Sequence, residues 1–167
     1  MLGVITHAHS CIFIGASMGA ILAFECATQL RQRGFSIERI ISIDGGGQPY
    51  MMPNIKFEEH HTQMCALMAR YAYNDDNEIS EQMREAMIEN AWQLLQMLQR
   101  YHPKRFIELG VSLLKVTGSE ADDYGWHRIA NTCIKQIPGT HENMLDEKNS
   151  PVVADIVAEI VNNLARF

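Results

Sequence analysis

A serine that could act as a nucleophile lies near the start of the chain. Gly15 to Gly19 (GASMG) form a G-x-S-x-G pattern, with the serine, Ser17, at its centre. The apolar run from Cys11 to Ile14 precedes the pattern, and a helical pattern follows without a break. Strand, tight turn and helix form the context in which this pattern marks a nucleophilic serine at a sharp elbow. The sequence therefore predicts that Ser17 attacks a carbonyl group.

The residues around Ser17 fit the demands of such an elbow. The turn raises the serine above the sheet in a strained backbone conformation. Side chains two residues before and after it would crowd the turn, so we expect Gly15 and Gly19 to serve by lacking them. A helix start has free N–H groups and a dipole that favour negative charge. We expect the main-chain N–H of Met18 to donate to the oxyanion formed during the reaction.

A serine nucleophile needs a base, and the chain contains seven histidines. His141 follows the last predicted strand in a loop that contains Pro138 and Gly139. It therefore lies at the carboxyl ends of the strands, where the sites of open α/β sheets are found. The others precede the elbow strand (His7, His9), lie in the central helical segment (His60, His61), or adjoin Pro103 and Trp126 (His102, His127). His141 is the predicted base.

Two positions could supply the acid that orients this base. Asp44 ends the predicted strand 37–44 and is followed by three glycines. Asp122 and Asp123 follow the next predicted strand, 111–117, which is the more usual position for such an acid. An aspartate before glycines can also simply form a turn. The order of residues leaves both positions open.

The elements that must position these residues alternate between strand and helix. Besides the two strands just named, the segments 11–16 and 133–137 have strand character. A helical pattern covers 20–33, we expect a helix to start near Trp126, and an apolar stripe from Val152 to Leu164 marks a final helix. This alternation predicts an α/β protein with a mostly parallel sheet and flanking helices. A chain of 167 residues has the length of one domain, 1–167.

Residues 50–110 form an insert of different character. The segments 56–73 and 79–100 have helical periods, and seven of the ten methionines lie between Met51 and Met97. Flexible methionine side chains adapt to varied apolar ligands, which would suit a mobile lid lining a substrate channel. Ordinary helix packing explains the same pattern, so both interpretations stay open.

Composition argues against several classes of function. The net charge of −6 argues against binding to nucleic acid. The cysteines (Cys11, Cys26, Cys65, Cys133) form no C-x-x-C pair, which fits a reduced cytoplasmic protein without a zinc site. Neither a membrane-spanning apolar run nor a signal peptide is recognisable, so we expect a cytoplasmic protein without membrane contact.

Three segments resemble the thioesterase domains that end nonribosomal peptide and polyketide synthases, a branch of the α/β-hydrolase superfamily. They are 15–34 (GASMGAILAFECATQLRQRG), 40–44 (IISID) and 139–145 (GTHENML), within a resemblance that runs from Cys11 to Leu164. The resemblance implies an α/β-hydrolase fold. It also implies a helical lid between two strands, at the place of the insert 50–110.

The same resemblance bears on the acid. In type I domains of the family, the acid ends the strand after the elbow helix, which implies the triad Ser17, Asp44 and His141. Stand-alone type II editing thioesterases often place the acid after the following strand, near Asp122 or Asp123. We favour the type I assignment.

The resemblance implies an enzyme that releases an acyl or peptidyl chain from the phosphopantetheine arm of a carrier protein. The chain would pass to Ser17 and leave by hydrolysis or macrocyclisation, with no cofactor and no metal. A type II editing thioesterase or a general esterase is one alternative. A non-catalytic α/β-hydrolase fragment that acts as a binding module is another.

The N-terminus departs from the family pattern. Ten residues precede Cys11, whereas this fold normally has several strands before the elbow and a loop that supplies a second oxyanion donor. We therefore expect a truncated domain whose elbow strand has an unpaired edge, which permits self-association. We also expect this chain alone to be a poor enzyme or inactive.

Overall fold

The computed structural model describes residues 10–47, 55–72, 80–118 and 122–164, and the structural statements below concern these residues. The chain divides into two compact units. One combines residues 1–48 with 103–167, and the other comprises residues 49–102.

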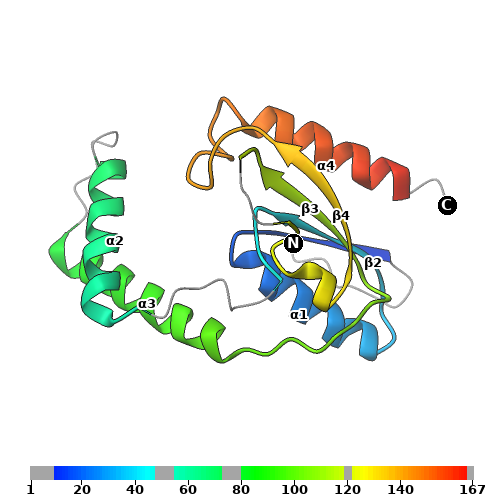
Figure 1. Ribbon diagram of the computed structural model, residues 1–167, viewed down its shortest axis with the longest axis horizontal. Coiled ribbons are helices and arrows are strands. Elements are labelled where there is room, and N and C mark those ends of the chain that lie inside the picture. Colours follow the sequence, from blue (N-terminus) through cyan, green and yellow to red (C-terminus); the bar gives the residue numbers. More distant parts are fainter. Residues whose placement is uncertain (1–9, 48–54, 73–79, 119–121, 165–167) are drawn as a thin grey trace, which may run out of the picture. The chain divides into compact units, whose positions relative to one another are not determined.

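The first unit is built on a sheet of four parallel strands in the order β1-β2-β3-β4 (Figure 1). The strands are β1 (Ser10–Ala16), β2 (Ser36–Ile43), β3 (Gly110–Val116) and β4 (Asn131–Ile137). Since all four run the same way, their carboxyl ends share one edge of the sheet. The predicted α/β-hydrolase-like sheet with flanking helices is confirmed.

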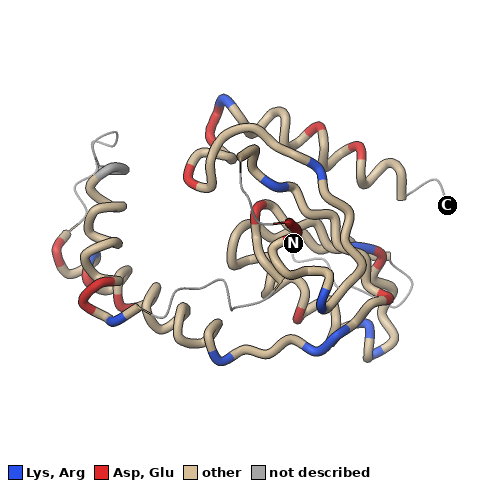
Figure 2. The backbone as a smooth tube through the Cα atoms, in the orientation of Figure 1, with Lys and Arg blue, Asp and Glu red and all other residues tan. Residues whose placement is uncertain are grey.

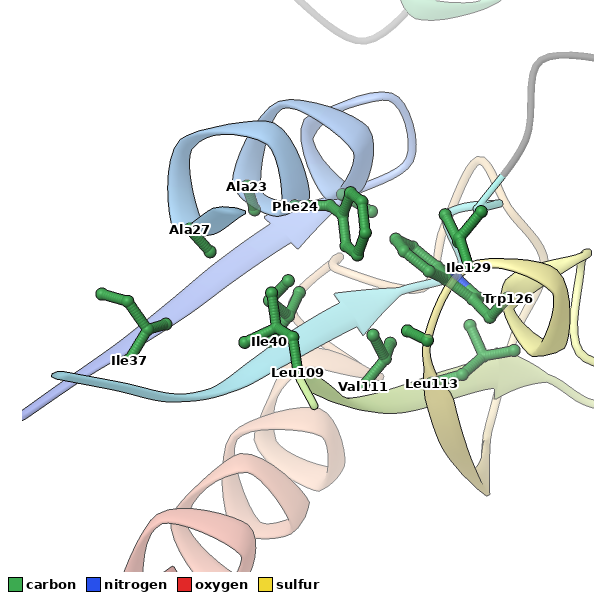
Figure 3. Close-up of a cluster of buried hydrophobic side chains, with 12 residues drawn as sticks. Ala23, Phe24, Ala27, Ile37, Ile40, Leu109, Val111, Leu113, Trp126 and Ile129 are labelled. Atoms are coloured by element: carbon green, nitrogen blue, oxygen red, sulfur yellow. The ribbon is translucent and has the colours of Figure 1, made fainter. Parts of the chain in front are cut away.

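Helices cover both faces of this sheet (Figure 1). The helix α1 (Gly19–Gln32) joins β1 to β2, and α4 (Ser150–Leu164) follows β4. Small residues of α1 bring it close to the sheet, and Phe24 packs beside them against Trp126, with ring centroids 5.6 Å apart (Figure 3). The apolar stripe of α4 packs on the opposite face, against a cluster that includes Ile41 and Leu114. Because helices lie on both faces, side chains that point to either face are buried along residues 40–43 of β2 and 111–115 of β3.

The connection from β3 to β4 differs from the prediction. In place of the expected α-helix, its described part contains a 3₁₀ helix of three residues, η2 (Trp126–Arg128). Gly125 precedes it with a φ of 83°, and the carboxylate of Asp123 accepts hydrogen bonds from the N–H groups of Gly125 and His127. This local bonding competes with helix propagation. Trp126 is fully buried, so η2 anchors the connection in the core.

The second unit contains α2 (Phe57–Ala72) and α3 (Glu81–Arg100), between β2 and β3 in the sequence. Ser80 caps α3 by accepting a hydrogen bond from the N–H of Met83 at 3.2 Å. Acidic residues occupy the first turns of both helices, where they offset the positive end of the helix dipole (Figure 2). The predicted helical insert therefore consists of two helices. Its function as a lid stays a prediction.

The insert should be less stable locally than the sheet. In α3, the described buried residues are Ile88 and Leu98, whereas most residues of β2 and β3 are buried. We expect the amide hydrogens of α2 and α3 to exchange faster than those of β2 and β3 in a hydrogen-exchange experiment. Equally slow exchange in both units would contradict a mobile lid and favour ordinary helix packing.

Within the described residues, β1 is an edge strand and pairs with β2 alone. The side chain of Ile14 is exposed, with 51% of its surface accessible. Self-association through this edge stays a prediction. No helix in the described ranges is both long and apolar enough to cross a membrane.

Candidate active site

Ser17 lies at a sharp turn between β1 and α1. Its φ is 51°, in the left-handed region that residues other than glycine rarely adopt. Its N–H donates to the carbonyl of Ile43 at 2.8 Å, which ties the turn to the end of β2. Met18 already has a helical conformation, and α1 begins at Gly19. The predicted strained elbow is therefore present, and such strain costs about 1–3 kcal/mol.

The glycines that must lack a side chain near the elbow are not the two that the sequence predicts. A Cβ on Gly15 would collide with the carbonyl group of Gly19, so the expectation for Gly15 is confirmed. A Cβ on Gly19 would meet no described atom within 4 Å, so the expectation for Gly19 is wrong. The second close approach is at Gly45, where a Cβ would collide with the carbonyl of Ser17. The sequence signal for it was the glycine run after Asp44.

The structure brings Ser17, His141 and Asp44 together. The Oγ of Ser17 lies 2.9 Å from Nε2 of His141, and Nδ1 of His141 lies 2.8 Å from Oδ2 of Asp44. These residues follow β1, β4 and β2, whose carboxyl ends meet at one edge of the sheet. An ionised carboxylate only accepts hydrogen bonds, so Nδ1 carries the proton. Nε2 is then free to accept the proton of the serine hydroxyl.

Asp44 is nearly buried, with 8% of its surface accessible, and has a left-handed φ of 48°. Its Oδ1 accepts hydrogen bonds from the N–H of Val116 at 3.0 Å and the hydroxyl of Tyr124 at 2.9 Å. Burial raises the pKa of Asp44, but the hydrogen bonds from His141, Val116 and Tyr124 together outweigh burial and leave the pKa below its usual value. Asp44 is therefore ionised at neutral pH.

His141 is half-exposed in the loop between β4 and α4. The hydrogen bond with Asp44 raises the pKa of His141, burial lowers it, and the charges of Asp44 and Glu142 raise it further. The net effect is a pKa above the usual value. The neutral form, which acts as the base, therefore becomes dominant at a higher pH than for an ordinary histidine.

The loop that carries His141 is held by its own hydrogen bonds. Gly139 has a φ of 93°, and the N–H of Thr140 donates to Oδ1 of Asn143 at 2.7 Å. The buried Asn149 donates from Nδ2 to the carbonyl of Asn143 at 2.9 Å. The two asparagines are polar groups that sequence reasoning missed, because no local motif marks them.

The other candidate acids are engaged elsewhere. The carboxylate of Asp123 lies 2.7 Å from Nδ1 of His127 and also accepts from two backbone N–H groups of the η2 turn. The Asp122 side chain is exposed, and the main-chain carbonyl of Asp122 accepts a hydrogen bond from Nζ of Lys115. Within the described residues, neither carboxylate has a hydrogen bond to His141.

The other histidines that the structure describes do not join the site. His61 pairs with Glu85, His60 packs against Trp92, and His102 is exposed. His7 and His9 lie outside the described residues. Among all the residues that the structure describes, no group of three or more His, Cys, Asp or Glu side chains is placed to hold a metal ion.

The position of Met18 suits an oxyanion donor. Met18 precedes the first turn of α1, and its carbonyl accepts from the N–H of Ile21 at 3.2 Å. Among the described residues, its own N–H donates to no backbone carbonyl. Its function in binding an oxyanion stays a prediction.

A strained serine at a strand-to-helix turn, bonded to a histidine that a carboxylate orients, has the geometry of a serine-hydrolase triad on an α/β-hydrolase-like sheet. The sequence matches the family model "Thioesterase domain" over residues 7–163. The chain therefore belongs to the thioesterase domain family, whose members are serine hydrolases.

Solved structures of thioesterases share this fold. The SrfTE domain, described in connection with cyclization of the lipopeptide antibiotic surfactin, matches with a TM-score of 0.66 and 23% identity over 90% of this chain. The NocB domain, solved as a covalent complex with a fluorophosphonate nocardicin G analog, matches with a TM-score of 0.72 and 20% identity over 88%. The type II thioesterase BorB from the borrelidin cluster matches with a TM-score of 0.59 and 18% identity over 89%.

This chain spans 67% of the SrfTE chain and 64% of each of the NocB and BorB chains. No curated protein sequence matches it significantly. The sequence resemblance to thioesterase domains of nonribosomal peptide and polyketide synthases is confirmed.

Proposed function

We propose that this chain carries the catalytic site of a thioesterase that releases an acyl or peptidyl chain from the phosphopantetheine arm of a carrier protein. The observation that carries the proposal is the continuous path of hydrogen bonds from Ser17 through His141 to Asp44 in a member of the thioesterase family. The structural likeness to a four-domain nonribosomal peptide synthetase supports a carrier-protein partner.

The contacts of the three residues define the steps of acyl transfer. Nε2 of His141 takes the proton from Oγ of Ser17 as Oγ forms a bond to the thioester carbonyl carbon. The carbonyl oxygen gains negative charge and faces the N–H of Met18 at the start of α1. When the C–S bond breaks, the thiol leaves with the proton held by His141, and an acyl ester on Ser17 remains.

The acyl ester is then cleaved by a second nucleophile. His141 deprotonates a water molecule, which gives a free acid, or a hydroxyl or amine of the acyl chain itself, which gives a ring. The bond between the acyl carbon and Oγ of Ser17 then breaks, and Nε2 of His141 returns the proton to Oγ. Asp44 stabilises the imidazolium in both half-reactions and keeps the proton on Nδ1. These steps use no cofactor or metal, and the phosphopantetheine belongs to the substrate.

A type II editing thioesterase is the second candidate, because the BorB fold is also similar. The contact between His141 and Asp44, rather than Asp122 or Asp123, favours the type I arrangement. The four cysteines are free thiols, which supports a location in the reducing cytoplasm.

The test is to give the purified protein one acyl chain in two forms, bound to a carrier protein and bound to free pantetheine. We expect an acyl adduct on Ser17 by mass spectrometry, and a higher kcat/KM for the carrier-bound form. Equal kcat/KM values would indicate a general esterase. Absence of any adduct, together with no labelling of Ser17 by a fluorophosphonate, would contradict catalysis by this chain alone, as expected of a domain without the second oxyanion donor or of a binding module.

The acyl group and the products separate the finer alternatives. Preference for a short acyl group over a full-length chain would indicate editing. A released ring differs from the linear acid by the mass of one water, so the same mass spectra distinguish macrocyclisation from hydrolysis.

A further inference from the structure

The loop between β3 and β4 is bound to the site's carboxylate and to the main chain that follows it. The hydroxyl of Tyr124 donates to Oδ1 of Asp44 at 2.9 Å. The carbonyl of Tyr124 accepts from the N–H of Gly47 at 3.0 Å, and Nε1 of Trp126 donates to the carbonyl of Gly45 at 2.8 Å. One loop therefore holds the Asp44 side chain and the main chain that follows it.

These contacts fix which oxygen of Asp44 faces the base. A carboxylate can rotate about its terminal bond, which exchanges its two oxygens. In Asp44, two donors meet at Oδ1, and Oδ2 is left for His141. The N–H of Val116 is part of β3, so the hydroxyl of Tyr124 is the one side-chain donor on Oδ1 among the described residues.

The backbone of Tyr124 is strained, and neighbouring residues hold the loop around it in place. Its φ of 51° lies in the left-handed region, which is unfavourable for a residue with a bulky side chain. The ammonium of the buried Lys115 lies 5.4 Å from the centre of the Tyr124 ring and donates to the carbonyl of Asp122 at 3.1 Å. The neighbouring turn at Asp123 and Gly125 is closed by its own hydrogen bond. The loop thus holds the hydroxyl against Asp44.

We propose that Tyr124 is a positioning residue of the triad, whose hydroxyl holds Asp44 in the orientation that presents Oδ2 to His141. The proposal rests on the proposed function of the site. It gives the loop after β3 a part in the site although neither Asp122 nor Asp123 is the acid.

The hydroxyl also affects the charge that His141 experiences. As a donor, it offsets part of the negative charge of Asp44, and this charge stabilises the protonated imidazole. Among the described residues, the other charged groups near the pair are Glu142, beside His141, and Lys115, beside the Tyr124 ring. Tyr124→Phe leaves both in place and removes only the hydroxyl. The pKa of His141 should therefore rise further in this variant.

The first experiment measures this change without turnover. The ring proton signals of His141 are followed against pH by NMR in the full chain, and assigned with His141→Gln. We expect a higher pKa of His141 in Tyr124→Phe than in the wild type. The matched control is Thr117→Val, which removes a hydroxyl that donates to the carbonyl of Ile137 rather than to Asp44. It should leave the titration unchanged.

The second experiment uses a double-mutant cycle, which separates positioning from general packing. Tyr124→Phe should lower kcat about tenfold, the magnitude expected for loss of a hydrogen bond to a charged group, with little change in KM. In an Asp44→Asn background the same change should lower kcat by less than about twofold, since the oriented carboxylate is already lost. Thermal unfolding of each variant checks that it folds.

An unchanged His141 titration in Tyr124→Phe, or the same loss of kcat in both backgrounds, would overturn the proposal. If Tyr124→Phe fails to fold, the titration is repeated with fluorinated tyrosine at position 124, whose stronger donor should lower the pKa of His141. A Ser17→Ala protein that keeps full turnover would overturn the proposed function instead, so the two failures can be told apart.

Discussion

Replacing Ser17 with alanine should lower thioester turnover by about 10⁶-fold, as loss of the nucleophile does in a serine protease. The Oγ of Ser17 is the atom that bonds to Nε2 of His141, and no other group in the proposed reaction accepts the acyl chain. His141→Ala should cost nearly as much, because the hydroxyl then loses its base. The double variant should be little worse than either single variant, since the two residues act as a unit.

Ser36→Ala is the matched control for this series. Ser36 is exposed at the start of β2, at the end of the sheet opposite the site. It should keep the turnover of the wild type and its rate of labelling by a fluorophosphonate. Full turnover in Ser17→Ala would remove Ser17 as the nucleophile. Losses that multiply in the double variant would show that Ser17 and His141 act independently.

Local sequence was sufficient for the elbow but not for every glycine around it. Ser17 could be identified because strand, turn and helix adjoin in the chain. The importance of Gly15 followed from the same turn. The close approach of Gly45 to Ser17 depends on how β2 lies beside β1, so spacing within the pattern could not reveal it.

The acid was harder to assign because both positions follow a strand at the correct edge of the sheet. Geometry separates them. Asp44 comes directly after the last residue of β2, and its N–H donates to the carbonyl of Leu114 in β3. Asp123 is instead drawn into the η2 turn by His127. The family resemblance favours the same residue, Asp44.

The contribution of Tyr124 could not be read from the sequence. Its hydroxyl meets a carboxylate 80 positions earlier in the chain, at a turn without a recognisable motif. The prediction of a helix near Trp126 gave no reason to expect a side chain from this connection in the site. The described connection is instead a short turn, and it supplies the side chain of Tyr124. Long-range polar contacts of this kind need the fold before they can be identified.

Asp44→Asn should lower kcat by up to about 10⁴-fold while preserving the fold, by analogy with a serine protease. Asparagine tolerates the left-handed φ of 48° at this position. Its Oδ1 can still accept from Val116 and Tyr124, so the change falls on the atom that faces His141. There an amide N–H would replace an acceptor. Nδ1 must then accept rather than donate, and Nε2 carries the proton and cannot take one from Ser17.

The matched control is Asp122→Asn, which makes the same chemical change on an exposed side chain. It should keep kcat within about twofold, as expected of a surface substitution away from the site. Asp123→Asn weakens the contacts with Gly125 and His127, so it should lower the unfolding temperature. Its effect on kcat should be small, because Asp123 has no hydrogen bond to His141 among the described residues. A severe loss of kcat in Asp122→Asn or Asp123→Asn, with a mild loss in Asp44→Asn, would contradict the type I arrangement. It would move the acid to the loop after β3, as in editing thioesterases.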